Sequence, residues 1–353
     1  MQRYVIEKVN NTSLYSGLRD LWSGVFGDEP EFVDSFYETF GADLTFGCGG
    51  CPADPAGSTG LISGYVICDG NKVVSALTLY KCGDMYVPEG EGTAQAAGSP
   101  VYVSYAICTD PEYRGRGYAA ALTEYVREYV TEELRGISIV SPAEPSLESF
   151  YSDLGYREGF RINEETCKTE NACQEDLSDG DPDDGILIWG LGDDGVPGLI
   201  DDEGPDPFDP GISVVSVSPA MYNKYRESFL SDVVHVSLCS EMMEAVRNCS
   251  YEGDGLLVIN GGDAIAAVSE VAGEETGTDP DDVQPKLLAS ELLVNPMLRR
   301  FSGEIEAEIA GRLAEYYGLD RLTYRTPGES VSQSMYAASD MTEMTGYFGF
   351  PLE

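Results

Sequence analysis

The sequence is short of basic residues and of long apolar runs, and each shortage excludes a class of protein. Only 21 Lys and Arg stand against 62 Asp and Glu, which gives a formal net charge of −41. A nucleic-acid-binding surface needs basic patches, so we expect no nucleic-acid partner. No run of about 18 apolar residues is present, and the opening MQRYVIEKVNNT lacks the apolar stretch of a signal peptide. We therefore expect a cytoplasmic protein with no membrane partner.

Metal-ligating residues are also scarce. The chain has one histidine, His235, and a single CxxC pattern formed by Cys48 and Cys51. A structural zinc site needs about four ligands, so we predict no metal. The nine cysteines form no regular framework, and we expect most of them to be reduced and inert. A redox role for Cys48 and Cys51 stays open.

One segment has residue types and spacing suited to a particular ligand. Residues 103–108, VSYAIC, predict a buried strand that ends at Asp110 and Pro111. From Leu122 the apolar residues recur at helical spacing. Glycines in the turn between them let backbone N–H groups approach an anion, the helix N-terminus adds positive potential, and arginines add charged donors. We predict a pyrophosphate ligand at this turn, which reads Arg114-Gly115-Arg116-Gly117-Tyr118-Ala119.

Several interpretations of this turn are open from the residues alone. Gly115, Gly117 and Ala120 fit the dinucleotide pattern G-x-G-x-x-G/A. In the dinucleotide fold, however, the first glycine follows the strand almost at once, whereas here about six residues intervene, a proline among them. The turn could also be an ordinary strand-to-helix connection with solvated arginines.

Two motifs favour a third interpretation. The pattern R-x-x-G-x-A, from Arg114 to Ala119, resembles the acyl-CoA-binding motif of the GNAT superfamily of N-acetyltransferases. Residues 137–141 predict the next strand, and after it Tyr151 stands four residues before Gly155 and its aromatic neighbour, which resembles the second signature of that family. The resemblance is specific over residues 100–160 and loose elsewhere. Over the whole chain it is to bacterial two-domain GNAT proteins, distantly like the enhanced intracellular survival acetyltransferases.

The resemblance implies a site for acetyl-CoA. In this family the strand before the loop splays from its neighbour and pairs with the pantetheine arm, and the backbone amides of the loop, here residues 114–119, hold the pyrophosphate. In this chain the pantetheine contacts would come from Ile107, Cys108 and Thr109, and Cys108 would contribute backbone rather than a thiolate. Tyr151 would protonate the departing CoA thiolate, because a phenol with a pKa of about 10 stays protonated at neutral pH. The alternative is that Tyr151 is a core aromatic.

The second half of the chain repeats the pattern of the first. Residues 257–268 match residues 66–77 as strand, turn and strand. Further on, Arg300 and Ser302 stand where the first copy has its two loop glycines. Side chains at these positions would obstruct the approach of a pyrophosphate to the backbone. We therefore expect the second copy to lack a cofactor site.

These patterns predict an α+β protein with tandem GNAT-like domains, each a mixed, mostly antiparallel sheet flanked by helices. The expected divisions are an N-terminal domain with the acetyl-CoA site at 1–168, an acidic Gly/Pro-rich linker at 169–211 and a degenerate domain at 212–353.

The predicted activity is acetyl transfer from acetyl-CoA to a primary amine of a small molecule or peptide. The acidic charge permits a cationic acceptor, although solubility explains it equally well. The alternatives are a non-catalytic CoA- or ligand-binding module and a dinucleotide-binding enzyme, and homo-oligomer formation is left open. No general base is evident, so Tyr105, Glu144, Glu148, a water chain and the terminal carboxylate of Glu353 all stay open.

Overall fold

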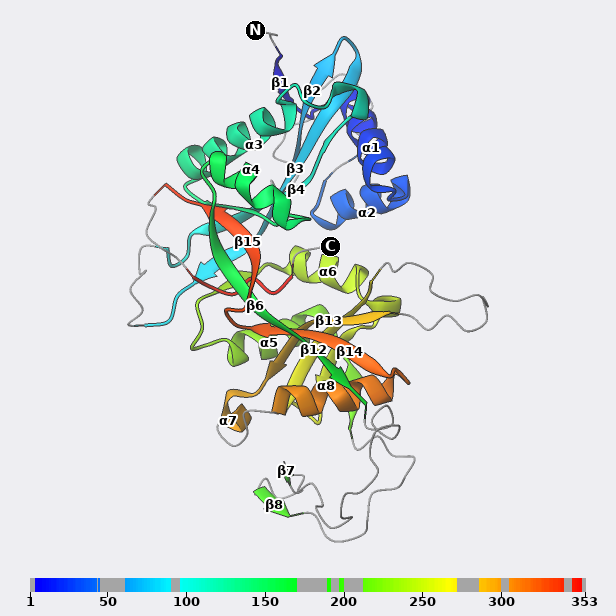
Figure 1. Ribbon diagram of the computed structural model, residues 1–353, viewed down its shortest axis with the longest axis vertical. Coiled ribbons are helices and arrows are strands. Elements are labelled where there is room, and N and C mark those ends of the chain that lie inside the picture. The colour runs from blue at the N-terminus through cyan, green and yellow to red at the C-terminus, as the bar shows by residue number, and fades with distance from the viewer. Residues whose placement is uncertain are drawn as a thin grey trace.

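The computed structural model describes residues 4–42, 44, 61–89, 96–169, 212–271, 286–299, 305–339 and 345–350, together with the backbone of 189–191 and 197–199. In this part of the chain 13 strands form one continuous sheet with helices on both faces (Figure 1). Most neighbouring strands are antiparallel, and the predicted mixed, mostly antiparallel sheet flanked by helices is confirmed. None of the described helices is long and apolar enough to cross a membrane. The predictions made for Cys48, Cys51, Arg300, Ser302 and Glu353 lie outside the described residues.

The first half of the chain begins with two helices whose ends follow from local chemistry. The side chain of Asn11 accepts a hydrogen bond from the backbone N–H of Leu14 at 3.0 Å and so caps α1, as its sequence predicts. Gly27 ends this helix in the left-handed conformation that favours glycine. The elements follow in the order β1 (Ile6–Lys8), α1 (Thr12–Phe26), α2 (Pro30–Thr39), β2 (Ile62–Asp69), β3 (Lys72–Tyr86), β4 (Pro100–Thr109), α3 (Tyr118–Glu128), β5 (Ile137–Val140), α4 (Glu148–Asp153) and β6 (Arg157–Lys168).

Alternation along the strands places helices on both faces of this half. On β3, Ala76 and Tyr80 pack with the buried residues of α1 and α2. Leu77 and Leu79 face the opposite way and pack with the buried side of α3, including Leu122. Two apolar layers therefore hold the middle strands, and β4 lies between them.

The second half repeats this order. After β9 and α5 come β10 and α6, then three antiparallel strands, two helices and a strand that is parallel to its neighbour. The elements are β9 (Val214–Ser216), α5 (Pro219–Phe229), β10 (His235–Leu238), α6 (Ser240–Asn248), β11 (Leu256–Ile259), β12 (Ala264–Glu270), β13 (Leu287–Val294), α7 (Pro296–Arg299), α8 (Ile305–Tyr316), β14 (Arg321–Pro327) and β15 (Val331–Ala337). Two further short strands, β7 (Trp189–Leu191) and β8 (Pro197–Leu199), pair with each other alone.

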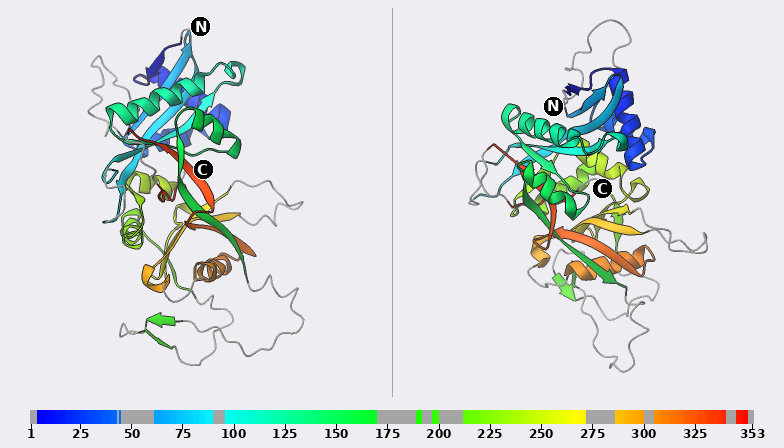
Figure 2. Two further views of the ribbon diagram at one scale, coloured as in Figure 1. Left: turned by 60° about the vertical axis from the view of Figure 1, so that its left-hand side comes forward. Right: turned by 45° about the horizontal axis from the view of Figure 1, so that its top comes forward.

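The two halves exchange their last strands. Twelve strands of the sheet follow the order β1-β2-β3-β4-β5-β15-β6-β14-β13-β12-β11-β9, and β10 pairs with β3 beside this path. Thus β15 of the second half lies between β5 and β6, and β6 of the first half lies between β15 and β14 (Figures 1 and 2). Each half is completed by a strand of the other. The division at residues 168 and 212 stays a prediction, but a strand from beyond 212 belongs to the first half's sheet.

The aromatic segment near the C-terminus is buried between the halves. Tyr347, Phe348 and Phe350 are each at most 2% exposed. The guanidinium of Arg226 on α5 donates to the Phe348 carbonyl at 3.1 Å and to the carboxylate of Glu291 at 3.0 Å, and both charged side chains are fully buried. A buried pair of this kind holds its neighbours in one arrangement, because removal of either partner leaves an uncompensated charge.

Candidate active site

The strands β4 and β5 pair only at one end. Residues 101–103 of β4 pair in parallel with 137–139 of β5. Within the described strands, β4 has no partner on this side after Val103, so its backbone from 104 to 109 borders an opening. The register with β3 also shifts between Tyr105 and Cys108, where Ala106 has a φ of +48°. Such backbone costs about 1–3 kcal/mol for a non-glycine residue and is common at functional sites.

The three residues predicted to contact pantetheine lie along this opening in different situations. Ile107 lines a pocket described below. The carbonyl of Cys108 already accepts a hydrogen bond from the Ser75 hydroxyl at 2.9 Å, and that of Thr109 accepts one from the Arg114 guanidinium at 3.2 Å. Burial raises the pKa of the Cys108 thiol to about 12, so this thiol is neutral at pH 7.

The glycine turn is exposed and leads directly into α3. Gly115 and Gly117 have φ angles of +74° and +80°, and no atom lies within 4 Å of the position that a Cβ would take at either. Gly117 is the N-cap residue of α3, so the free N–H groups of the helix start point out of this turn. The guanidinium of Arg116 lies 4.5 Å from the centre of the Tyr113 ring. Tyr118 is buried beneath the turn, and its loop neighbours remain open to an anion.

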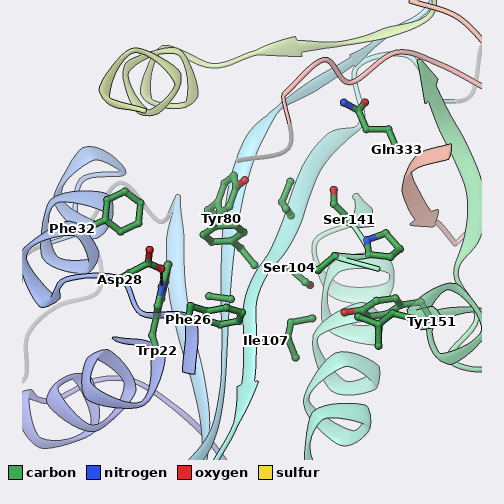
Figure 3. A pocket seen from close by; sticks show the side chains of 16 residues that line it. Trp22, Phe26, Asp28, Phe32, Tyr80, Ser104, Ile107, Ser141, Tyr151 and Gln333 are labelled. Atoms are coloured by element: carbon green, nitrogen blue, oxygen red, sulfur yellow. Dashed lines mark hydrogen bonds between the residues drawn. The ribbon is translucent and has the colours of Figure 1, made fainter. Parts of the chain in front are cut away.

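Tyr151 projects from α4 into the wall of the pocket. Its side chain is 7% exposed, and its ring contacts those of Phe150 and Tyr156 at centroid distances of 5.1 and 6.1 Å. Figure 3 shows its hydroxyl directed towards Ile107. Burial raises the pKa of Tyr151 above the usual value of a phenol, so the hydroxyl stays protonated at neutral pH.

Gly155 explains the second motif in structural terms. It has a φ of +87°, and a Cβ at this position would lie 2.7 Å from the Arg127 side chain. The glycine lets the chain turn sharply after α4, so that Tyr156 enters the core and its hydroxyl hydrogen-bonds the Ser138 hydroxyl at 2.9 Å. Tyr151 packs in one apolar cluster with Tyr156 and with Val140, the last residue of β5.

The pocket beside the opening has a volume of about 630 Å³. One side is formed by α1, α2 and their connection, which contribute Trp22, Asp28 and Phe32 (Figure 3). The other side is formed by α4 and by β15 of the second half. Asp28 is the only acidic side chain among the described residues that line this pocket. Its carboxylate accepts a hydrogen bond from the Trp22 indole N–H at 2.6 Å, which orients it.

The sequence profile of the acetyltransferase (GNAT) domain family matches residues 9–159, a span that includes α1 to α4 and both motifs. This part of the chain is a GNAT acetyltransferase domain. It identifies the protein as an acyltransferase, as the resemblance of its two motifs predicts. A comparison with curated proteins finds no match to the sequence.

Solved structures extend the GNAT likeness in fold to nearly the whole chain. A probable N-acyltransferase from Enterococcus faecalis is similar with a TM-score of 0.57 and 13% identity, over 96% of this chain and 74% of that one. A GCN5-related N-acetyltransferase from Anabaena variabilis has a TM-score of 0.56 and 11% identity, over 94% of this chain and 72% of that one. Eis1 from Mycobacterium abscessus has a TM-score of 0.50 and 11% identity, over 91% of this chain and 65% of that one. At sequence identities this low, the similarity to these structures shows a shared fold and nothing further.

The residues that line the pocket can be compared with the candidates for the general base. Tyr105 lines the pocket, but burial raises its pKa far above neutrality and disfavours the anion that a base requires. Glu144 and Glu148 are not among the lining residues. No cluster of His, Cys, Asp or Glu suited to a metal occurs among the residues that the structure describes.

Sequence reasoning missed the pocket residues outside the two motifs. Trp22 lies on α1 and Phe32 on α2, and the spacing of apolar residues along a helix does not separate a pocket wall from a core. Asp28 lies between the helices in a short connection with no motif. The one sequence signal that could have identified Asp28 is its position as an acidic residue between aromatic residues on both sides.

Proposed function

We propose that this protein transfers the acetyl group of acetyl-CoA to a cationic primary amine. The observation that carries the proposal is the meeting of three features at the opening between β4 and β5. The unpaired backbone of β4 leads from the glycine turn to the pocket, and Tyr151 and Ile107 face each other there (Figure 3).

The opening and the turn suit the two ends of the CoA chain. Beyond Val103 the backbone of β4 has no strand partner on this side among the described residues, and its free groups, those of Ile107 among them, can pair with the amides of pantetheine as an added strand. The turn offers the N-terminal N–H groups of α3 and the two arginines to the pyrophosphate. Its basic character stands out in a chain of net charge −41.

The chemistry then requires two proton movements. The neutral amine attacks the thioester carbonyl, the C–S bond breaks, and the thiolate takes a proton from the Tyr151 hydroxyl. The amine nitrogen loses its own proton to solvent or a base. Tyr151 suits the donor role because its hydroxyl is buried in the pocket wall, directed towards the opening and protonated at neutral pH.

The pocket suits an acceptor with a positive charge. Phe26 and Phe32 present exposed aromatic surface, and a cation is attracted to the face of such rings. Asp28 adds a carboxylate whose orientation the Trp22 indole N–H fixes. We propose that these three side chains bind the ammonium form of the acceptor, or a second ammonium on it.

An assay of thiol release tests the function. We expect acetyl-CoA to raise the melting temperature of the protein, and NAD to leave it unchanged, because only the former matches the opening and the turn. Thiol release should depend on an added amine from a panel that includes polyamines, aminoglycosides and lysine peptides. Stabilisation by acetyl-CoA without amine-dependent thiol release would instead favour a non-catalytic binding module.

Replacement of Asp28 tests the acceptor site. We expect Asp28→Asn to raise KM for a cationic amine roughly 10-fold, because a hydrogen bond to a charged group contributes about 1.5–3 kcal/mol and the amide keeps only its dipole. The amide oxygen can still accept from the Trp22 indole, so the pocket wall is retained. Steady-state kinetics with saturating acetyl-CoA measures the change.

Asp20→Asn is the matched control for this change. Asp20 lies on α1, its side chain is 66% exposed, and it does not line the pocket. The Asp20→Asn substitution removes the same charge from the protein as Asp28→Asn. An equal rise in KM for both variants would therefore show general electrostatic attraction rather than a site at Asp28.

A further inference from the structure

The pocket contains a buried amide group that has no hydrogen-bond partner among the described residues. Gln333 is 8% exposed, and neither its side-chain nitrogen nor its side-chain oxygen is bonded within the part of the chain that the structure describes. The hydroxyl of Tyr80, on a residue that is fully buried, is unpartnered in the same sense, and both residues line the pocket.

The fold brings Gln333 into the pocket through an irregularity in β15. The register between β15 and β6 shifts at Ser332 and Ser334, so that Gln333 is left out of the ladder. The Ser334 hydroxyl hydrogen-bonds that of Ser141 at 2.7 Å, and Ser141 also lines the pocket. The second half of the chain thus supplies a polar side chain to the site of the first.

An unpaired buried amide is costly. Each buried donor or acceptor left without a partner costs about 1–3 kcal/mol, and most such groups in proteins are satisfied. Where the unpaired group faces a cavity, a ligand that completes its hydrogen bonds recovers this free energy. Gln333 offers one acceptor and two donors on a planar group, and Tyr80 adds a hydroxyl.

We propose that Gln333 is a specificity-determining residue that binds an amide of the acceptor, either a primary carboxamide or the N–H and C=O of one extended peptide residue. The proposal rests on the acetyl transfer proposed above. A primary carboxamide presents a donor and an acceptor on the same side and forms two straight hydrogen bonds with a glutamine side chain. The N–H and C=O of one extended peptide residue do the same, whereas those of a single trans peptide unit point in opposite directions. A single hydroxyl oxygen would have to serve both atoms of Gln333 at less favourable angles.

The position of Gln333 separates this contact from the reacting amine. In Figure 3 Gln333 lies at one end of the pocket, whereas Ile107 and Tyr151 lie at the other. Asp28 is on a third side, with Trp22. The acceptor that fits is therefore an amine joined by a spacer to an amide, such as a lysine side chain on a peptide or an amino amide.

Three series of acceptors with matched chain lengths test the proposal: ω-amino amides, ω-amino alcohols and plain alkylamines. Every compound carries one primary amine. We expect kcat/KM to be at least about 10-fold higher for the best amino amide than for the alkylamine of the same length, since two hydrogen bonds of ordinary strength are gained. Gln333→Met keeps the unbranched shape and removes both polar atoms, so this ratio should fall towards one.

Ser332→Ala is the matched control, because Ser332 neighbours Gln333 on β15 and does not line the pocket. It should keep the wild-type preference for the amide. An equal rate with amides and alkylamines in the wild type, a preference that persists in Gln333→Met, or a preference for the amino alcohol would each overturn the proposal.

Failure of the proposed transfer is separable from failure at Gln333. If no amine is acetylated although acetyl-CoA binds, calorimetry with the amino amide still compares wild type and Gln333→Met. Tighter binding to the wild type supports the amide site, and equal binding overturns it.

Discussion

Gly117→Glu should abolish the binding of acetyl-CoA. Gly117 combines a φ of +80° with open space where a Cβ would lie, at the first turn of α3. A glutamate side chain fills the space beside the N–H groups and places a negative charge where the pyrophosphate would bind. Loss of the hydrogen bonds and the added repulsion should weaken binding by roughly 100-fold or more. Titration calorimetry with acetyl-CoA measures the loss.

A second glycine provides the control for backbone strain. Gly318 has a φ of +68° and open space around it, and it follows α8 in the second half, far from the turn. Gly318→Glu introduces the same charge and the same strain. It should lower stability as much as Gly117→Glu while acetyl-CoA binding is retained. Unchanged binding in Gly117→Glu would remove the turn from the cofactor site.

Tyr151→Phe should lower kcat by about 100-fold, with little change in affinity for acetyl-CoA. The ring is retained and continues to pack against Phe150, so the pocket wall is preserved and only the proton donor is lost. General acid catalysis contributes about 10²–10⁴ to a rate, so an effect of this size is expected. Pre-steady-state release of CoA, at saturating amine, measures the chemical step.

The pH dependence distinguishes this role from packing. Burial raises the pKa of Tyr151, and a raised phenol pKa means that the proton-donating form persists to higher pH. The rate should therefore rise as the amine is deprotonated and should not decline through loss of this proton below a pH of about 10. A decline at lower pH, absent from Tyr151→Phe, would contradict the raised pKa.

Tyr156→Phe is the matched variant for Tyr151→Phe. Tyr156 belongs to the same motif, is 2% exposed, does not line the pocket, and bonds to the Ser138 hydroxyl. Removal of the Tyr156 hydroxyl should reduce the free energy of unfolding by about 1 kcal/mol and leave kcat near the wild-type value. If both variants reduce kcat equally, the effect belongs to packing around α4 and not to proton donation.

Much of the first half could be predicted because its signals are local. The Asn11 cap, the turn between β2 and β3 and the succession of β4, glycine turn and α3 follow from residues close in sequence. The strands β11 and β12 of the second half also lie where the strand-turn-strand pattern of residues 257–268 indicates. The repeated order of elements is visible in the sequence for the same reason.

The exchange of strands could not be predicted from these signals. β6 has one short apolar alternation, at Phe160 and Ile162, and such a pattern does not specify the partner of a strand. Pairing between β15 and β5 joins residues nearly two hundred positions apart, as the Ser141–Ser334 hydrogen bond shows. Such contacts depend on how the completed halves pack.

The sequence by itself determined the proposed cofactor side of this protein, and the tertiary structure decided the proposed acceptor side. The turn at Gly117 and the Tyr151 motif are contiguous patterns, because backbone conformation and helix ends depend on neighbouring residues. Asp28 and Gln333 carry no motif and come from opposite halves of the chain. They line one pocket only because the exchanged strand β15 completes the first half's sheet beside the opening of β4.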